Sequence, residues 1–254
     1  MSVVELLTLN ADNLGKVQMF CGHSPTYRQG YRAKIEWART RLAEGWRYTL
    51  LTVDGRNAGM LETAPAENGW RGVDAPGYHL IHCLWVVGRN RKHGYGRKLL
   101  ENALAEAQET NGLVVLSSRS HWLPTRKIFL KNGFQVIDEE PPFELLALRL
   151  KNSAPLPSIR RNQVDIPQGL VLYQANQCPY MQNLPLVVKT VGSQLGIPVQ
   201  VIQLDNPSQA QAGPCPYGVL GIYLDGQFLD YRPLGTKSLL AAIAAIKTRG
   251  LETI

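Results

Sequence analysis

Cysteine is scarce in this 254-residue chain, and acidic residues are fewer than basic ones. The four cysteines lack the spacing of metal ligands and are too few for a secreted disulfide scaffold, so we expect reduced thiols and no metal site. No apolar run reaches the length of a membrane span, and the start has no basic segment followed by a long apolar stretch. We therefore expect a cytoplasmic protein without a signal peptide or a membrane anchor.

Basic residues outnumber acidic ones by 27 to 20, which gives a formal net charge of +7 and a pI near 9.3. Such a charge suits a polyanionic partner, whether the phosphates of coenzyme A, a nucleic acid or an acidic surface. Aromatic residues are not interleaved with the basic ones as they are on a base-stacking platform, so we do not expect a nucleic-acid partner. The length exceeds that of one typical domain and favours two.

Residues 80–104 hold the pattern around which the rest of the chain is arranged. A buried strand over residues 80–87 is followed by a basic loop with two glycines and then by a helix with apolar residues at helical spacing. Glycines let several backbone N–H groups converge on one anion, and the cations Arg97 and Lys98 at the start of the helix are unfavourable unless an anion binds there. The pattern predicts a phosphate site, and a solvated basic face is the alternative.

Arg91, Gly94 and Gly96 form an Arg-x-x-Gly-x-Gly motif after a Leu-x-Val strand end. This motif resembles the pyrophosphate loop of the GNAT superfamily of N-acetyltransferases. A second motif, the Asn-Gly-Phe that ends at Phe134, resembles the end of an apolar helix in the same family, where glycine terminates the helix. The resemblance covers residues 3–150 and extends to the bacterial YoaP-like acetyltransferases. A Rossmann loop would need a third glycine.

The resemblance implies an α/β protein with an α+β GNAT fold: a mixed, mostly antiparallel sheet with helices on both faces. It also implies transfer of acetyl from acetyl-CoA to an amine by direct attack on the thioester. Pantetheine would lie beside the central strand like an added strand, and the Val86 N–H would stabilise the oxyanion as a catalytic group. The implied coenzyme contacts are Leu84, Trp85, Val86, Arg91, Lys92, His93, Gly94, Tyr95, Gly96, Arg97, Trp122 and Phe129.

The acceptor amine must lose a proton before it attacks, because an alkylammonium has a pKa near 10.4. Strand alternation predicts that His82 shares a face with Leu80 and Leu84. An imidazole pKa near 6.5 suits a general base, although a buried core histidine is an equal alternative. Phe129 stands where many family members have the tyrosine that protonates the leaving thiolate, and Trp122 replaces a frequent asparagine. The proton donor to the thiolate therefore stays open.

By the same resemblance, residues 21–37 would form a helical lid over the acceptor site, with His23, Tyr27 and Tyr31 as contacts. The alternative is that these aromatic residues pack inward. The sequence leaves the identity of the amine acceptor open. It also leaves the oligomeric state open, a homodimer included.

We expect a GNAT domain over residues 1–150, a Pro/Ser-rich linker over 151–166 and a smaller α/β domain over 167–254. The predicted order of strands and helices in the last domain resembles thioredoxin. Cys178 and the two residues after it resemble the start of a glutaredoxin motif, but Met181 stands where the second cysteine would be. A helix N-terminus lowers the pKa of a thiol, so we expect a thiolate at Cys178.

Three functions follow from these patterns. The first is an acetyl-CoA-dependent N-acetyltransferase. The second is an acyl-CoA-binding sensor with little catalysis, because Trp122 and Phe129 depart from the family pattern. The third is a monothiol glutaredoxin-like oxidoreductase centred on Cys178, with Cys215 as a partner only if the fold brings the two together. We favour the first, with the C-terminal domain as a binding or positioning module.

Overall fold

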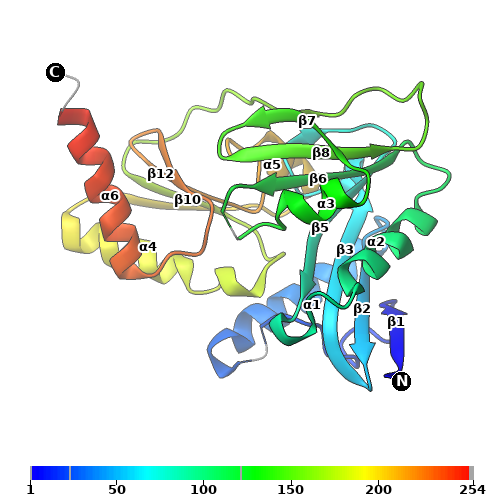
Figure 1. The fold of residues 1–254 in the computed structure, drawn as a ribbon. Coiled ribbons are helices and arrows are strands. Elements are labelled where there is room, and N and C mark those ends of the chain that lie inside the picture. Colours follow the sequence, from blue (N-terminus) through cyan, green and yellow to red (C-terminus); the bar gives the residue numbers. More distant parts are fainter. Residues whose placement is uncertain (1, 23, 121, 252–254) are drawn as a thin grey trace.

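The computed structural model describes residues 2–22, 24–120 and 122–251, which form two lobes that each hold a sheet (Figure 1). The α-helices are α1 (Arg28–Leu42), α2 (Tyr95–Glu106), α3 (Arg126–Lys131), α4 (Leu184–Leu195), α5 (Pro207–Ala212) and α6 (Thr236–Leu251). The 3-10 helices are η1 (Pro25–Tyr27), η2 (Ala66–Asn68), η3 (Gly88–Asn90) and η4 (Pro179–Met181). Among the described residues, no helix combines the length and hydrophobicity that crossing a membrane requires.

The larger sheet belongs to the N-terminal lobe and has the strand order β1-β2-β3-β5-β6-β8-β7. Its strands are β1 (Val4–Thr8), β2 (Arg47–Val53), β3 (Arg56–Pro65), β5 (His79–Val86), β6 (Gly112–Ser118), β7 (Gln135–Glu140) and β8 (Phe143–Arg149). Every neighbouring pair is antiparallel except β5 and β6, which run parallel. The predicted mixed, mostly antiparallel sheet is thus confirmed.

Helices cover both faces of this sheet. On one face, Trp37 and Ala38 of α1 share a buried cluster with Leu80 of β5. On the other face, Leu99 of α2 shares a second cluster with Leu84. Apolar side chains of β5 belong to both clusters, so the strand is buried on both faces. Helices α1 and α2 therefore pack against it from opposite sides.

Strand β5 carries one residue more than its partner β3. Glu62 pairs with Cys83 and Thr63 pairs with Ile81, so His82 is left over as a β-bulge. A bulge interrupts the alternation of side chains. The prediction that residues 80, 82 and 84 share one face is therefore wrong.

The smaller sheet belongs to the C-terminal lobe and has the strand order β11-β10-β12-β13. Strand β10 runs parallel to β11 and antiparallel to β12, and β12 forms a hairpin with β13. Helices α4 and α6 pack against each other beside this sheet (Figure 1). The strands are β10 (Leu170–Gln174), β11 (Val199–Gln203), β12 (Leu220–Leu224) and β13 (Gln227–Asp230).

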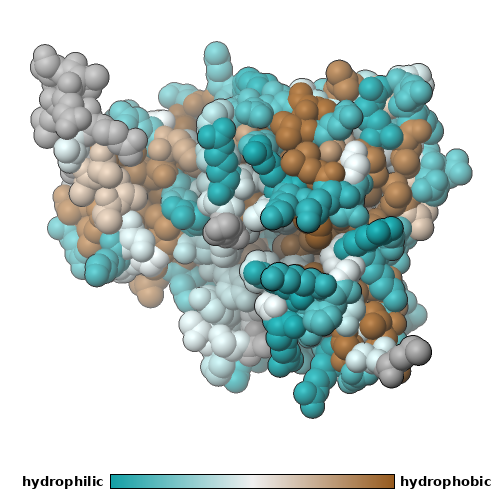
Figure 2. Space-filling model, viewed as in Figure 1, coloured by the Kyte–Doolittle hydropathy of each residue, from teal (hydrophilic) through white to brown (hydrophobic). Residues whose placement is uncertain are grey.

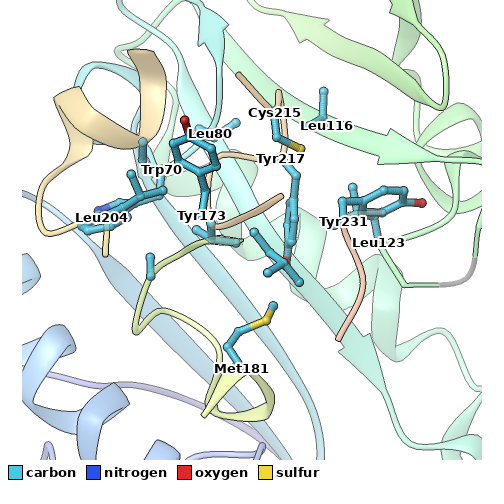
Figure 3. Packing of buried hydrophobic residues seen from close by; sticks show 14 of the residues in the cluster. Trp70, Leu80, Leu116, Leu123, Tyr173, Met181, Leu204, Cys215, Tyr217 and Tyr231 are labelled. Carbon is cyan, nitrogen blue, oxygen red and sulfur yellow. The ribbon is translucent and has the colours of Figure 1, made fainter. Parts of the chain in front are cut away.

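The two lobes are packed tightly together. One buried cluster runs through both, and Trp70 and Leu80 of the N-terminal lobe lie beside Tyr173 of the C-terminal lobe in Figure 3. The segment predicted as a linker is itself tied down, because β9 (Ser158–Ile159) pairs with β4 (Val73–Asp74). The two lobes therefore share a well-packed interface.

Two further interactions fix this interface. The side-chain amide of Gln211 in α5 donates hydrogen bonds to the carbonyl oxygens of Glu67 and Gly69, both at 2.9 Å. A Cβ atom at Gly218 would lie 2.4 Å from the carbonyl oxygen of Trp70, so only glycine fits this close approach. The positions of the two lobes are consequently set by direct backbone contact.

Candidate active site

A groove of about 980 Å³ runs along the end of β5, the basic loop and the starts of α2 and α3. Hydrophilic side chains surround this part of the surface (Figure 2). Nine of the twelve predicted coenzyme contacts line it: Leu84, Trp85, Val86, Arg91, Lys92, Gly94, Tyr95, Gly96 and Arg97. Sequence reasoning missed residues of the α3 side, among them Thr125, Ile128, Lys131 and Asn132.

The loop before α2 turns sharply to aim backbone N–H groups at the groove. Lys92 and Gly94 have left-handed backbone conformations, with φ values of 69° and 80°, and Gly94 is the N-cap of α2. The first N–H groups of a helix have no partner within it, and the helix dipole favours an anion there. Among the basic side chains, Arg97 is already paired with Glu101 at 2.7 Å. The backbone at the start of α2 therefore has the geometry for an anion site, and the phosphate site that the glycine pattern indicates stays a prediction.

Strand β5 has an open edge next to this loop. It pairs with β6 only over residues 79–81, although both strands continue beyond that point. The Val87 N–H donates to Ala58 on the β3 side at 2.9 Å, so by alternation the backbone groups of Leu84 and Val86 point to the open side. The Arg91 Nε–H reaches the Val86 carbonyl oxygen there at 3.3 Å. This edge has room for an extended ligand to pair with the strand.

Three of the predicted coenzyme contacts do not line this groove. Phe129 is fully buried with its ring against that of Phe134, so its role as a coenzyme contact is not supported. His93 instead stacks on Tyr95 with ring centroids 5.8 Å apart. Trp122 lines the neighbouring cavity described next.

A second cavity, of about 360 Å³, lies between the two lobes. The N-terminal lobe contributes Met19, Phe20, Cys21, Lys34, Tyr48, Met60, Glu62, Arg71, His82, Cys83, Trp85, Trp122, Leu123 and Pro124. The C-terminal lobe contributes Gln177, Cys178, Pro179, Tyr180 and Tyr217. Trp85, Leu123 and Pro124 also line the groove, so the two hollows share a wall.

Two of the predicted acceptor residues, Tyr27 and Tyr31, are described, and neither is part of the wall of this cavity. Tyr27 packs edge-on against Tyr180 with centroids 4.7 Å apart, outside the cavity. The hydroxyl of Tyr31 accepts a hydrogen bond from the Met19 N–H at 3.1 Å, which fits the inward-packing alternative. His23 lies outside the described residues.

A buried charged network forms one side of the cavity. Glu62 accepts hydrogen bonds from the Lys34 ammonium at 2.8 Å and from the Gln177 side-chain amide at 2.7 Å. The Gln177 carbonyl oxygen accepts in turn from Arg71 at 2.9 Å. Burial by itself raises the pKa of Glu62, but Lys34 and His82 outweigh it and hold that pKa well below its usual range. Glu62 therefore stays ionised.

His82 is held in place by this network. Its Nε2 accepts a hydrogen bond from the Trp70 N–H at 2.9 Å, which leaves the proton on Nδ1, 3.6 Å from Glu62 Oε1. Burial lowers the pKa of His82 to about 4. An imidazole whose accepting nitrogen is already used cannot take a proton from the acceptor, so the geometry favours the core-histidine alternative over the general base.

Three thiols also face the cavity, one each from the segment before α1, from β5 and from the C-terminal lobe. Burial raises the pKa of Cys83 to about 12 and that of Cys178 to about 11, and it also raises the pKa of Cys21. The expected lowering at Cys178 is therefore wrong, because the loss of hydration outweighs the favourable backbone contact. Cys178 and Cys215 are both free. Among the described residues, no cluster of His, Cys, Asp or Glu could hold a metal ion.

Comparison with known proteins gives matches that span the residues lining the groove. Residues 14–134 match the sequence model of the acetyltransferase (GNAT) family. The chain is also 26% identical over 234 residues to the uncharacterized N-acetyltransferase YoaP of Bacillus subtilis strain 168, a match that covers 89% of this chain and 92% of that protein. The resemblance to the GNAT family that the sequence motifs predicted is thus confirmed over residues 14–134. The predicted reaction, N-acetyl transfer from acetyl-CoA, is thereby confirmed.

Solved structures of GNAT proteins are among the similar folds. A GNAT acetyltransferase of Desulfovibrio desulfuricans is 16% identical with a TM-score of 0.42, covering 59% of this chain and all of that one. A GNAT acetyltransferase of Brucella melitensis, solved in complex with acetyl-CoA, is 16% identical with a TM-score of 0.38, covering 61% of this chain and 92% of that one.

The loop geometry predicts that Gly96→Asp abolishes acetyl-CoA binding. A Cβ at position 96 would lie 2.5 Å from Ile128 Cδ1, and the carboxylate would add a negative charge at the anion site. Calorimetric titration should give no measurable heat with the variant. Gly235→Asp is the control, since position 235 has open space and lies outside the groove. Equal affinity of the Gly96 variant and the wild type would contradict the assignment.

The buried state of His82 predicts a dependence of stability on pH. Below about pH 6.5 the unfolded chain takes up a proton at this residue, but the folded chain does so only near pH 4, so stability falls across that window. The loss should reach roughly 3 kcal/mol, at 1.36 kcal/mol per pKa unit. His82→Gln keeps an acceptor for Trp70 and should flatten the slope in urea unfolding, whereas exposed His93→Gln should not. A retained slope in His82→Gln would refute this account.

Proposed function

We propose that the groove binds acetyl-CoA and that the 360 Å³ cavity binds the amine acceptor. The wall that the two hollows share at Trp85, Leu123 and Pro124 is the observation that carries this assignment. A thioester delivered along β5 reaches the acceptor only where groove and cavity adjoin. Direct transfer between two bound substrates needs such an arrangement, because the reacting atoms must lie within contact distance.

The chemistry at this junction is attack of the amine nitrogen on the thioester carbonyl carbon. A C–N bond forms and negative charge moves to the carbonyl oxygen, where the Val86 N–H on the open side of β5 would stabilise it. The C–S bond then breaks, and the departing sulfur takes up the proton that the amine gives away. The products are an N-acetylated amine and free coenzyme A.

The environment of the cavity itself favours the neutral form of the amine. Glu62 and His82 are both weak bases here, because their pKa values lie below the usual range. A hydrophobic wall and the net positive charge that Arg71 contributes beside the neutral Lys34–Glu62 pair instead disfavour an ammonium ion. Desolvation and like charge both lower the pKa of an amine, so the bound acceptor is deprotonated by its surroundings.

The C-terminal lobe is a thioredoxin-like module that has a positioning role in this proposal. The order β11-β10-β12-β13, with β10 and β11 parallel, supports that likeness. Its boundaries follow the predicted linker over residues 151–166. The raised pKa of Cys178 argues against thiolate chemistry, whereas its place in the cavity wall supports a role in closing the acceptor site.

We place the reaction in the cytoplasm. Four free cysteines support this location, since thiols stay reduced there.

Slow alkylation of Cys178 is expected from this proposal. At pH 8, a thiol with a pKa near 11 is ionised roughly two orders of magnitude less than an ordinary one, and only the thiolate reacts. Iodoacetamide labelling followed by mass spectrometry should show protection in the native chain and fast reaction in urea. Cys178→Ser should keep the acetyltransferase rate within about threefold. Fast native labelling together with loss of activity would instead favour the oxidoreductase.

The proposed function is tested by thiol release that depends on both acetyl-CoA and an amine. Val86→Pro removes the N–H on the open side without breaking the ladder to β3, so kcat should fall by about 10²- to 10³-fold while the chain stays folded. Val87→Pro is the matched contrast, because the Val87 N–H is part of the ladder and its loss should lower the melting temperature. An unchanged kcat in Val86→Pro would remove Val86 from catalysis.

A further inference from the structure

Arg71 is a buried cation without a counter-ion. It is 2% exposed, and among the described residues no carboxylate lies within ion-pair distance of its guanidinium. Its hydrogen bonds go to neutral oxygens instead: the carbonyls of Trp70 and His82 at 2.8 and 2.7 Å, and the side chain of Gln177 at 2.9 Å. Burial lowers the pKa of Arg71. A buried charge without an opposite partner costs several kcal/mol, which an anionic ligand would offset.

The other charges of the cavity do not supply that anion. Glu62 is the one carboxylate among the described residues of the wall, and Lys34 at 2.8 Å already neutralises it. His82 is neutral, because its pKa is near 4. The cavity wall thus carries a net charge of about +1 near neutral pH, contributed by Arg71. The Nε–H of Arg71 also has no acceptor among the described residues.

The rest of the cavity is apolar. Away from the charged side chains, the wall consists mostly of methionine and aromatic side chains, namely Met19, Phe20, Met60, Trp85, Trp122 and Tyr180. Its volume of about 360 Å³ lies near the lower end for small-molecule sites. Because the C-terminal lobe closes it with Gln177, Cys178 and Tyr180, the site suits a compact ligand rather than a folded protein.

We infer that the acceptor is a small amino acid-like amine whose carboxylate pairs with Arg71 and whose apolar side chain packs against the aromatic wall. This inference rests on the proposed function of the cavity. Guanidinium matches carboxylate through paired N–H donors, which single out arginine for this recognition. The carboxylate would sit at Arg71 and the amine would face the junction at Trp85. Gln177, which bonds to both Glu62 and Arg71, is a positioning residue for this site.

Matched pairs of acceptors test the inference on the full-length protein. L-phenylalanine is compared with 2-phenylethylamine, and L-leucine with 3-methylbutylamine, by thiol release from acetyl-CoA. The members of each pair differ only in the carboxylate. We expect kcat/KM to be at least tenfold higher for the amino acid. Equal or higher values for the decarboxylated amines would overturn the carboxylate but leave the N-acetyltransferase intact, whereas acetyl-CoA binding without turnover of any amine would overturn both.

Variants locate the carboxylate. Arg71→Met should raise KM for phenylalanine at least tenfold and change KM for phenylethylamine much less, so that the preference disappears. Arg41→Met is the control: Arg41 is also largely buried but lies outside the cavity, so its loss should lower stability without changing the preference. If Arg71→Met does not fold, Gln177→Leu is used instead. It removes the hydrogen bond that positions Arg71 and should likewise reduce the preference for phenylalanine over phenylethylamine. A preference retained in a folded Arg71 variant would refute the pairing.

Discussion

The bulge at His82 is the constraint on which the rest of the site depends. One extra residue in β5 turns Leu80 and Leu84 to opposite faces, so α1 and α2 can clamp the strand from both sides. It also frees the His82 carbonyl oxygen, which accepts from Arg71 at 2.7 Å. Beyond the bulge β5 leaves β6, and the open edge that results is where an extended coenzyme arm can pair. Groove and cavity therefore both originate in one insertion.

Gln177 joins the two lobes at the point where charge is buried. Its amide donates to Glu62 while its carbonyl accepts from Arg71, so one neutral side chain forms hydrogen bonds with two opposite charges. Buried polar networks are stabilising only when every member has its partners. Without the C-terminal lobe, these hydrogen bonds to Glu62 and Arg71 would be missing. The cavity proposed for the acceptor is thus a property of the whole chain and not of the N-terminal lobe alone.

Local patterns predicted the groove but not the cavity. The helix and strand bounds around residues 80–104 follow from periodicity, and the loop follows from its glycines, because both depend on neighbours in sequence. The bulge leaves no trace in the pattern of β5. The network joins positions more than a hundred residues apart, as Arg71 and Gln177 are, so spacing cannot show it. One signal of the network was present in the sequence: Lys34 and Glu62 are charged residues at positions that periodicity assigns to the core.

Cys178 shows why a correct local motif can carry the wrong chemistry. The motif places this thiol at the start of η4, where backbone N–H groups favour a thiolate. The N-terminal lobe then covers it, and the loss of water raises the thiol pKa by more than the backbone lowers it. Met181, at the place of a second redox cysteine, is 2% exposed and belongs to the core. Both motif positions therefore serve packing at the interface, which fits a module that shapes the proposed acceptor site.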